Sequence, residues 1–105
     1  MHIYSFSSIA VERVRKAIEE KEYICIFGDR DVDGVSSSAL LYESLKKLNA
    51  RVDVSVPRGD EGYGLSEKVI DSFNESGCKL IITVDNGITA FKAVEKANLI
   101  RIPAE

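Results

Sequence analysis

The chain has 105 residues, of which 45% are apolar and 30% charged, which suits one domain with a single hydrophobic core. No apolar run approaches the roughly 20 residues of a membrane-spanning helix, and the opening MHIYSFSS lacks the features of a secretory signal, so we expect a cytoplasmic protein without membrane contact. The net charge of −3 gives no indication of a basic surface, so a phosphate ligand would depend on metal ions or a few local basic groups.

Hydrophobic periodicity predicts that helices and strands alternate along the chain. Helices with apolar residues on one face are expected at 7–22, 35–49, 66–77 and 89–98, and the first three have serines at or near their beginning. Strands are expected at 23–27, 51–57, 79–84 and 99–103. YICIF, in the first of these strands, is a continuous apolar run, which is typical of a central strand covered on both faces, and KLIITV is a second strand of the same central type.

This alternation predicts an α/β fold, a three-layer doubly wound and mainly parallel sheet of the Rossmann-like type. If the strand at 23–27 lies between the strands at 51–57 and 79–84, the two most apolar strands are neighbours in the sheet. Ligands of such sheets bind beyond the carboxyl ends of the strands, where the strand order reverses. Cys25 and Cys78 lie in or beside these strands, and we expect both to be reduced core residues.

Acidic residues follow both of the apolar strands. Asp29, Asp31 and Asp33 come after the first strand, and Asp85 follows the other in TVDNG. Carboxylates at this spacing repel one another unless a cation lies among them, and such hard oxygen ligands suit Mn²⁺ or Mg²⁺ better than zinc. We therefore take Asp29, Asp31 and Asp85 as candidate metal ligands, whereas Asp33 with Gly34 is expected to form a structural turn.

Residues beside these aspartates are candidates for positions near a phosphate group. Ser36 and Ser37 are expected in the first turn of the next helix, whose free amides favour an anion, although helix capping is the competing interpretation. Arg30, Asn86 and Gly87 adjoin the candidate ligands and are assigned to the same vicinity.

Two other kinds of acidic site have aspartate motifs similar to the segment 29–34. A calcium loop needs an acidic twelfth residue and a preceding helix, but the twelfth residue from Asp29 is Leu40 and a strand precedes. A haloacid-dehalogenase-like phosphatase would use Asp31 as nucleophile and Asp33 as acid. This phosphatase stays a minor alternative, because its nucleophile normally follows the strand directly, whereas GDR separates Asp31 from the strand here. The phosphatase interpretation also does not explain the segments EGYGLS and TVDNG.

Three segments together resemble a known family. FGDRDVDGVSSSALL, VPRGDEGYGLS and LIITVDNGITAFKAVEKA are similar, in order and spacing, to the DHH phosphoesterase domain of RecJ-like single-strand exonucleases, over about residues 9–98. The resemblance implies a hydrolase that holds two Mn²⁺ or Mg²⁺ ions in the complete enzyme, with Asp29, Asp31 and Asp85 among the ligands. It also implies 5′-to-3′ degradation of single-stranded DNA in repair and recombination. Arg30 departs from the uncharged residue usual in the family.

The family's third motif, Asp-His-His, has no counterpart here, since the only histidine is His2. The fourth motif and the second domain are not recognised either. We therefore expect residues 1–105 to be an N-terminal part of a DHH domain, with little or no nuclease activity alone and a sheet edge open to self-association. The alternatives are a DHH phosphodiesterase of oligonucleotides or cyclic dinucleotides, and a non-catalytic DHH-like binding module.

Overall fold

The computed structural model describes residues 1–6, 8–28, 32–55, 67–84 and 99, with the backbone alone at 32–34. Strands and helices alternate along this part of the chain, as the sequence predicts. The strands are β1 (His2–Ser5), β2 (Tyr23–Gly28), β3 (Arg51–Ser55) and β4 (Leu80–Val84), and the helices are α1 (Val11–Glu19), α2 (Val32–Lys47) and α3 (Glu67–Glu75). None of these helices is long and apolar enough to cross a membrane.

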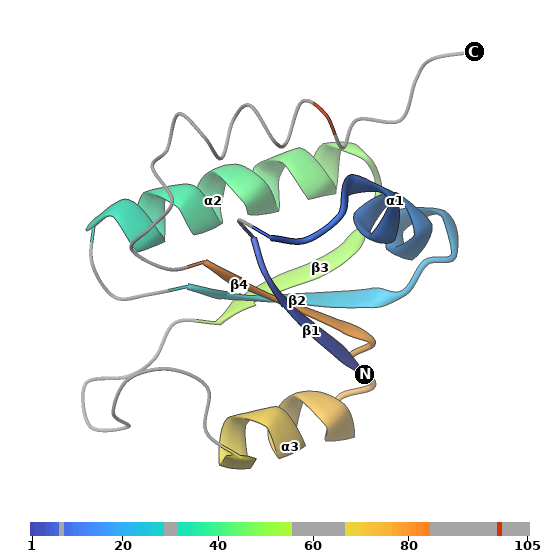
Figure 1. Cartoon of the computed structure of the whole chain (residues 1–105), viewed down its shortest axis with the longest axis vertical. Coiled ribbons are helices and arrows are strands. Elements are labelled where there is room, and N and C mark those ends of the chain that lie inside the picture. Colours follow the sequence, from blue (N-terminus) through green and yellow to red (C-terminus); the bar gives the residue numbers. More distant parts are fainter. Residues whose placement is uncertain (7, 29–31, 56–66, 85–98, 100–105) are drawn as a thin grey trace.

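The four strands form one parallel sheet in the order β1-β4-β2-β3. Helices α1 and α2 lie on one face of the sheet and α3 on the other (Figure 1). The predicted α/β class, the parallel sheet and the three layers are therefore confirmed. The position of β2 between β3 and β4 is also confirmed, so the two most apolar strands are neighbours.

Strand β1 was not predicted. It pairs with β4, with Ile3 opposite Ile81 and Ser5 opposite Thr83, and thereby occupies the β4 edge that we expected to be open. HIYS is short and mostly exposed, so it has no periodicity of its own, and pairing with a buried neighbour makes it a strand. Within the described residues the outermost strands are β1 and β3, and self-association through either edge stays a prediction.

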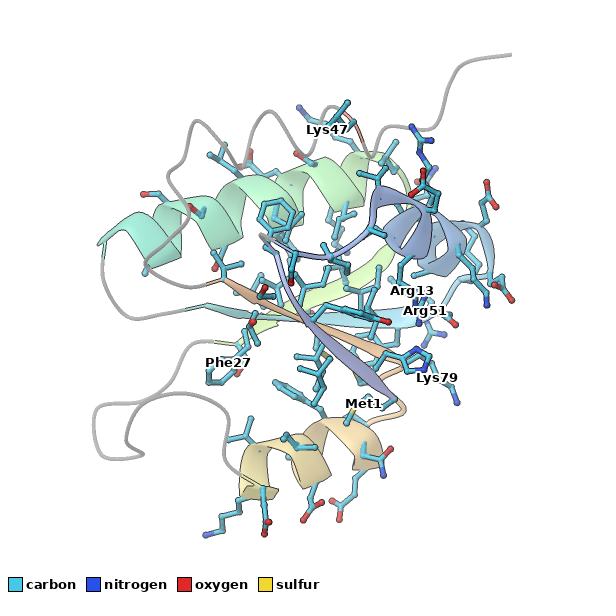
Figure 2. All side chains as sticks on the ribbon, in the orientation of Figure 1. Met1, Arg13, Phe27, Lys47, Arg51 and Lys79 are labelled. Carbon is cyan, nitrogen blue, oxygen red and sulfur yellow. The ribbon has the colours of Figure 1, made fainter. Side chains whose placement is uncertain are left out.

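The main hydrophobic core lies between the sheet and helices α1 and α2. Ile24 and Ile26 point from β2 to this side, where they pack with Leu41 and Leu45 of α2, all four fully buried. Alternate residues of a strand face opposite ways, and Phe27 lies on the α3 side of the sheet (Figure 2). Both faces of β2 are thus covered, as its continuous apolar run predicts.

The helices begin and end at residues that differ from the predicted limits. Ala10, rather than a serine, is the N-cap of α1, and the Ser8 hydroxyl instead contacts that of Ser5 at 2.6 Å. Gly77, with φ +86°, follows α3 in the left-handed conformation that glycine favours, as expected of a terminating glycine. The helix expected at 89–98 and residues 100–103 of the last strand lie outside the described residues, and Leu99 is helical rather than extended.

Helix α2 begins at Val32 rather than at Val35. Asp33 and Gly34 therefore belong to its first turn and do not form the separate turn that we expected, and Ser36 and Ser37 fall in the second turn. An acidic residue in a first helical turn is stabilised by the helix dipole, and one glycine costs a helix only about 1 kcal/mol. These two effects explain why an Asp-Gly pair, which often marks a turn, is helical here.

Tyr23 connects the beginning of β2 to β3. Its hydroxyl donates a hydrogen bond to Asp53 Oδ2, and the Arg51 guanidinium lies 5.7 Å from the centre of its ring. The hydrogen bond to Asp53, followed by burial, raises the pKa of Tyr23 above its ordinary value. The folded chain thus holds the phenol proton more tightly than the unfolded chain, so the stabilisation is complete below about pH 10 and is lost as the pH rises further.

We therefore expect Tyr23→Phe to lower the free energy of unfolding by about 0.5–1 kcal/mol at neutral pH. The difference from wild type should shrink above about pH 10. Urea unfolding followed by circular dichroism over a pH series measures both effects. Tyr4→Phe, on the exposed strand β1, is the control and should change neither. A difference that stays constant across the pH series would contradict this account.

Candidate metal centre

The strands that lead to the candidate metal ligands end side by side. β2 and β4 are parallel neighbours, and Gly28 and Val84, the last residue of each, are register partners. Asp29 follows Gly28 in the sequence and Asp85 follows Val84. The candidates Asp29, Arg30, Asp31, Asp85, Asn86 and Gly87 themselves lie outside the described residues. The structure thus establishes the arrangement of the two strands before the acidic segments.

These strand ends are held firmly in the fold. Ile82 and Val84 of β4 are at most 2% exposed, and Ile26 of β2 is fully buried opposite Ile82. Close packing of such residues leaves a strand little freedom to slide against its neighbour, since a one-residue slip would turn every side chain to the wrong face. The shared end of β2 and β4 is therefore a rigid base for a binding site.

The N-terminal end of α2 lies close in sequence to the end of β2, with Gly28 and Val32 separated only by residues 29–31. Backbone amides at a helix N-terminus carry partial positive charge and favour anions. Of the two serines assigned to the vicinity of a phosphate, Ser36 is exposed and Ser37 is fully buried. Only Ser36 is thus open to a ligand in this conformation.

The opposite end of the sheet, where the strands begin, carries basic side chains and the histidine. His2 is paired with Leu80, at the beginning of β4, and its Nδ1 lies 3.2 Å from Arg13 Nη2. Arg13, Arg51 and Lys79 lie at this end, where the strands begin (Figure 2). The chain's only histidine is therefore far from the strand ends that precede the aspartates. Within the described part of the chain, no three His, Cys, Asp or Glu residues are grouped so that they would hold a metal ion.

Comparison with known proteins identifies the family. A model of the DHH family, N-terminal domain, matches residues 23–103. This chain belongs to the DHH family. The single-stranded-DNA-specific exonuclease RecJ of Bacillus subtilis (strain 168) is 48% identical over 82 residues, which cover 77% of this chain and 10% of that protein. RecJ of Escherichia coli (strain K12) is 42% identical over 96 residues, or 90% of this chain and 17% of that protein.

A solved structure agrees with this assignment. The crystal structure of the exonuclease RecJ bound to manganese matches with a TM-score of 0.61 and 29% sequence identity, over 73% of this chain and 21% of that one. The present DHH chain spans only about a tenth to a fifth of the length of the relatives it matches. A divalent metal is thus bound in the family. The carboxylates that follow β2 and β4 supply the oxygen donors that such an ion prefers, so the residues of this chain fit the metal.

One further feature of the DHH chain was not predicted from its sequence. A hollow of about 390 Å³ lies between α2 and the outer strand β3, and its lining is mostly apolar, with residues Val35, Ser38, Ala39, Tyr42, Asp53 and Val54. Ser38 is 2% exposed, and its Oγ has no hydrogen-bond partner. The helical spacing of Val35, Ser38, Ala39 and Tyr42 marks these residues as one face of a helix, but the capping interpretation of the serines concealed it.

We expect Ser38→Ala to stabilise the chain more than Ser44→Ala does. Both changes replace serine by alanine within α2, so they gain the same helix propensity. Ser44→Ala also removes a hydrogen bond to the Leu40 carbonyl at 2.9 Å, whereas Ser38→Ala removes a buried hydroxyl without a partner. The difference in the free energy of unfolding should be about 1 kcal/mol in favour of Ser38→Ala, measured by urea denaturation. Equal values would show that the Ser38 hydroxyl is satisfied in solution.

Proposed function

We propose that this chain supplies the first part of the catalytic domain of a RecJ-like exonuclease, which degrades single-stranded DNA from its 5′ end with Mn²⁺ or Mg²⁺. The observation that carries the proposal is the register pairing of Gly28 with Val84, because these residues directly precede Asp29 and Asp85. The homologues named RecJ support the substrate and the reaction. A role in DNA repair and recombination in the cytoplasm is part of the proposal, and it rests on the resemblance of the sequence motifs alone.

Asp29, Asp31 and Asp85 would hold the metal ions. When bound, two divalent ions supply an activated water and positive charge that stabilises the transition state of phosphodiester hydrolysis. The amides at the beginning of α2 would attract the scissile phosphate, and the exposed Ser36 would be within the same region. Arg30, Asn86 and Gly87 would line the approach to it. The positive charge of Arg30 would counter the negative charge of the phosphate.

Ligand number limits what residues 1–105 do alone. The three carboxylates are the candidate ligands, and the only histidine lies at the other end of the sheet. Divalent ions of this class need about six ligands each, so three carboxylates do not fix two ions in a defined geometry. We infer that the 105 residues are part of a DHH domain and show little or no nuclease activity in isolation.

A chimaeric enzyme tests this function. The segment of Bacillus subtilis RecJ that matches this chain over 82 residues is replaced by the corresponding residues of the chain. We expect the chimaera to degrade long single-stranded DNA from the 5′ end in the presence of Mn²⁺, while the isolated chain does not. Preference for short oligonucleotides or cyclic dinucleotides would favour a DHH phosphodiesterase instead. A folded but inactive chimaera would favour a non-catalytic module.

A further inference from the structure

The two cysteines of the chain lie in one small cluster between the sheet and α3. Cys25 is in the middle of β2 and Cys78 just before β4, and the two residues are 3% and 2% exposed. The pairing of β2 with β4 brings these thiols together although they are far apart in the sequence. The rest of the cluster consists of apolar and aromatic side chains, namely Phe27, Ile81, Tyr23, Val69 and Phe73.

The two thiols lie in the same buried cluster, and Cys78 Sγ donates a hydrogen bond to the Leu80 carbonyl at 3.2 Å. The hydrogen-bonding influence of Cys78, followed by burial, raises the pKa of Cys25, and that of Cys25 lowers the pKa of Cys78. Cys78 therefore gives up its proton more readily than its neighbour does. A nucleophilic thiolate beside a second sulfur is the arrangement in which a disulfide forms readily.

We propose that Cys25 and Cys78 are an oxidation site, a dithiol that a peroxide converts into an intrachain disulfide between β2 and the residues that lead into β4. In the first step the Cys78 thiolate attacks one peroxide oxygen. The O–O bond breaks, the sulfur becomes a sulfenic acid, and the departing hydroxide takes up a proton to become water. In the second step the Cys25 sulfur attacks the sulfenic sulfur, the S–S bond forms, and a second water leaves with the Cys25 proton. The two sulfurs thus supply the two electrons that reduce the peroxide.

Among the described residues, α3 is the element that covers this pair on its side of the sheet. No residue of α3 is buried, and the helix covers the cluster only with the partly buried side chains of Val69 and Phe73. The ring of Phe73 meets that of Phe27 edge to face, with centroids 6.4 Å apart. A helix held by so few buried contacts opens at a lower free energy than the main core. The proposal depends on the fold alone and not on the nuclease function.

The test compares oxidation of the folded and the unfolded chain. The complete 105-residue chain is treated with hydrogen peroxide, quenched, unfolded and alkylated with N-ethylmaleimide, and its intact mass is measured. The reduced chain accepts two adducts, one on each of its two cysteines. The oxidised chain should accept none, be lighter by two hydrogen atoms and remain monomeric on a non-reducing gel. The disulfide should form at least about tenfold faster in the folded chain than in denaturant, because the fold raises the effective concentration of the thiols.

Single-cysteine variants test the order of the two steps. Cys25→Ser should stop at a sulfenic acid on Cys78, which dimedone traps, whereas Cys78→Ser should react with peroxide several-fold more slowly. The proposal is overturned if the disulfide forms no faster in the folded chain than in denaturant, if only links between chains appear, or if the two variants react at the same rate. The wild-type comparison needs neither variant, so it decides the matter even where a variant fails to fold.

Discussion

Replacing Asp31 with alanine should lower the affinity of the chain for Mn²⁺ at least about tenfold, and Asp85→Ala should have the same effect. Each change removes one of three candidate carboxylate ligands, which leaves too few charged oxygens to replace the hydration shell of the ion. In the chimaera with RecJ described above, either change should abolish degradation of single-stranded DNA. Calorimetric titration with Mn²⁺ measures the affinity, and release of nucleotides measures the activity.

Asp71→Ala is the matched control for both aspartates. It removes the same charge from an exposed position on α3, on the opposite side of the sheet from α2 (Figure 1). A general loss of negative charge would weaken Mn²⁺ binding equally in all three variants. Loss in Asp31→Ala and Asp85→Ala alone assigns the ion to the ends of β2 and β4. If neither variant differs from Asp71→Ala, the proposed metal ligands are wrong, and the functional proposal loses its chemical basis.

The sheet was predictable because its central strands have strong patterns. YICIF is apolar throughout and KLIITV is mostly apolar, which is typical of strands covered on both faces. The helical segments between the strands make them parallel. β1 was not predictable, because its four mostly exposed residues become a strand only through pairing with β4. The predicted first residue of α2 was wrong for a related reason. Asp33 and Gly34 are typical turn residues, and only the surrounding structure makes them helical.

The candidate site was predictable at the level of strand order and not at the level of contacts. Parallel pairing alone implies that segments following β2 and β4 begin at the same edge, and the register of Gly28 with Val84 agrees. The burial of Ser37, by contrast, depends on how α2 lies on the sheet, which a local pattern does not specify. The presence of Cys25 and Cys78 in one buried cluster likewise arises from strand pairing and from the turn that precedes β4. Each cysteine was correctly predicted as a core residue, but their proximity was not foreseen.

Ile26→Ala should be among the most destabilising single changes in the chain. Ile26 is fully buried in β2, opposite Ile82 in β4, and its removal leaves a cavity between the sheet and α2. We expect the free energy of unfolding to fall by about 3–4 kcal/mol. Domains of this size are stable by only about 5–15 kcal/mol, so the melting temperature should fall by roughly 15 °C or more. Urea and thermal unfolding followed by circular dichroism measure these losses.

Ile3→Ala is the matched control, because it deletes the same side-chain atoms from β1, where Ile3 is 42% exposed. Its cost should stay below about 1 kcal/mol, since a large part of its surface is already in contact with water. Ile26→Val, which removes a single methylene group, should cost about 0.5–1.5 kcal/mol and lie between the two. Equal losses for Ile26→Ala and Ile3→Ala would mean that β2 is not the buried centre of the sheet. The strand ends that precede Asp29 and Asp85 would then lose the rigid support on which the proposed metal centre depends.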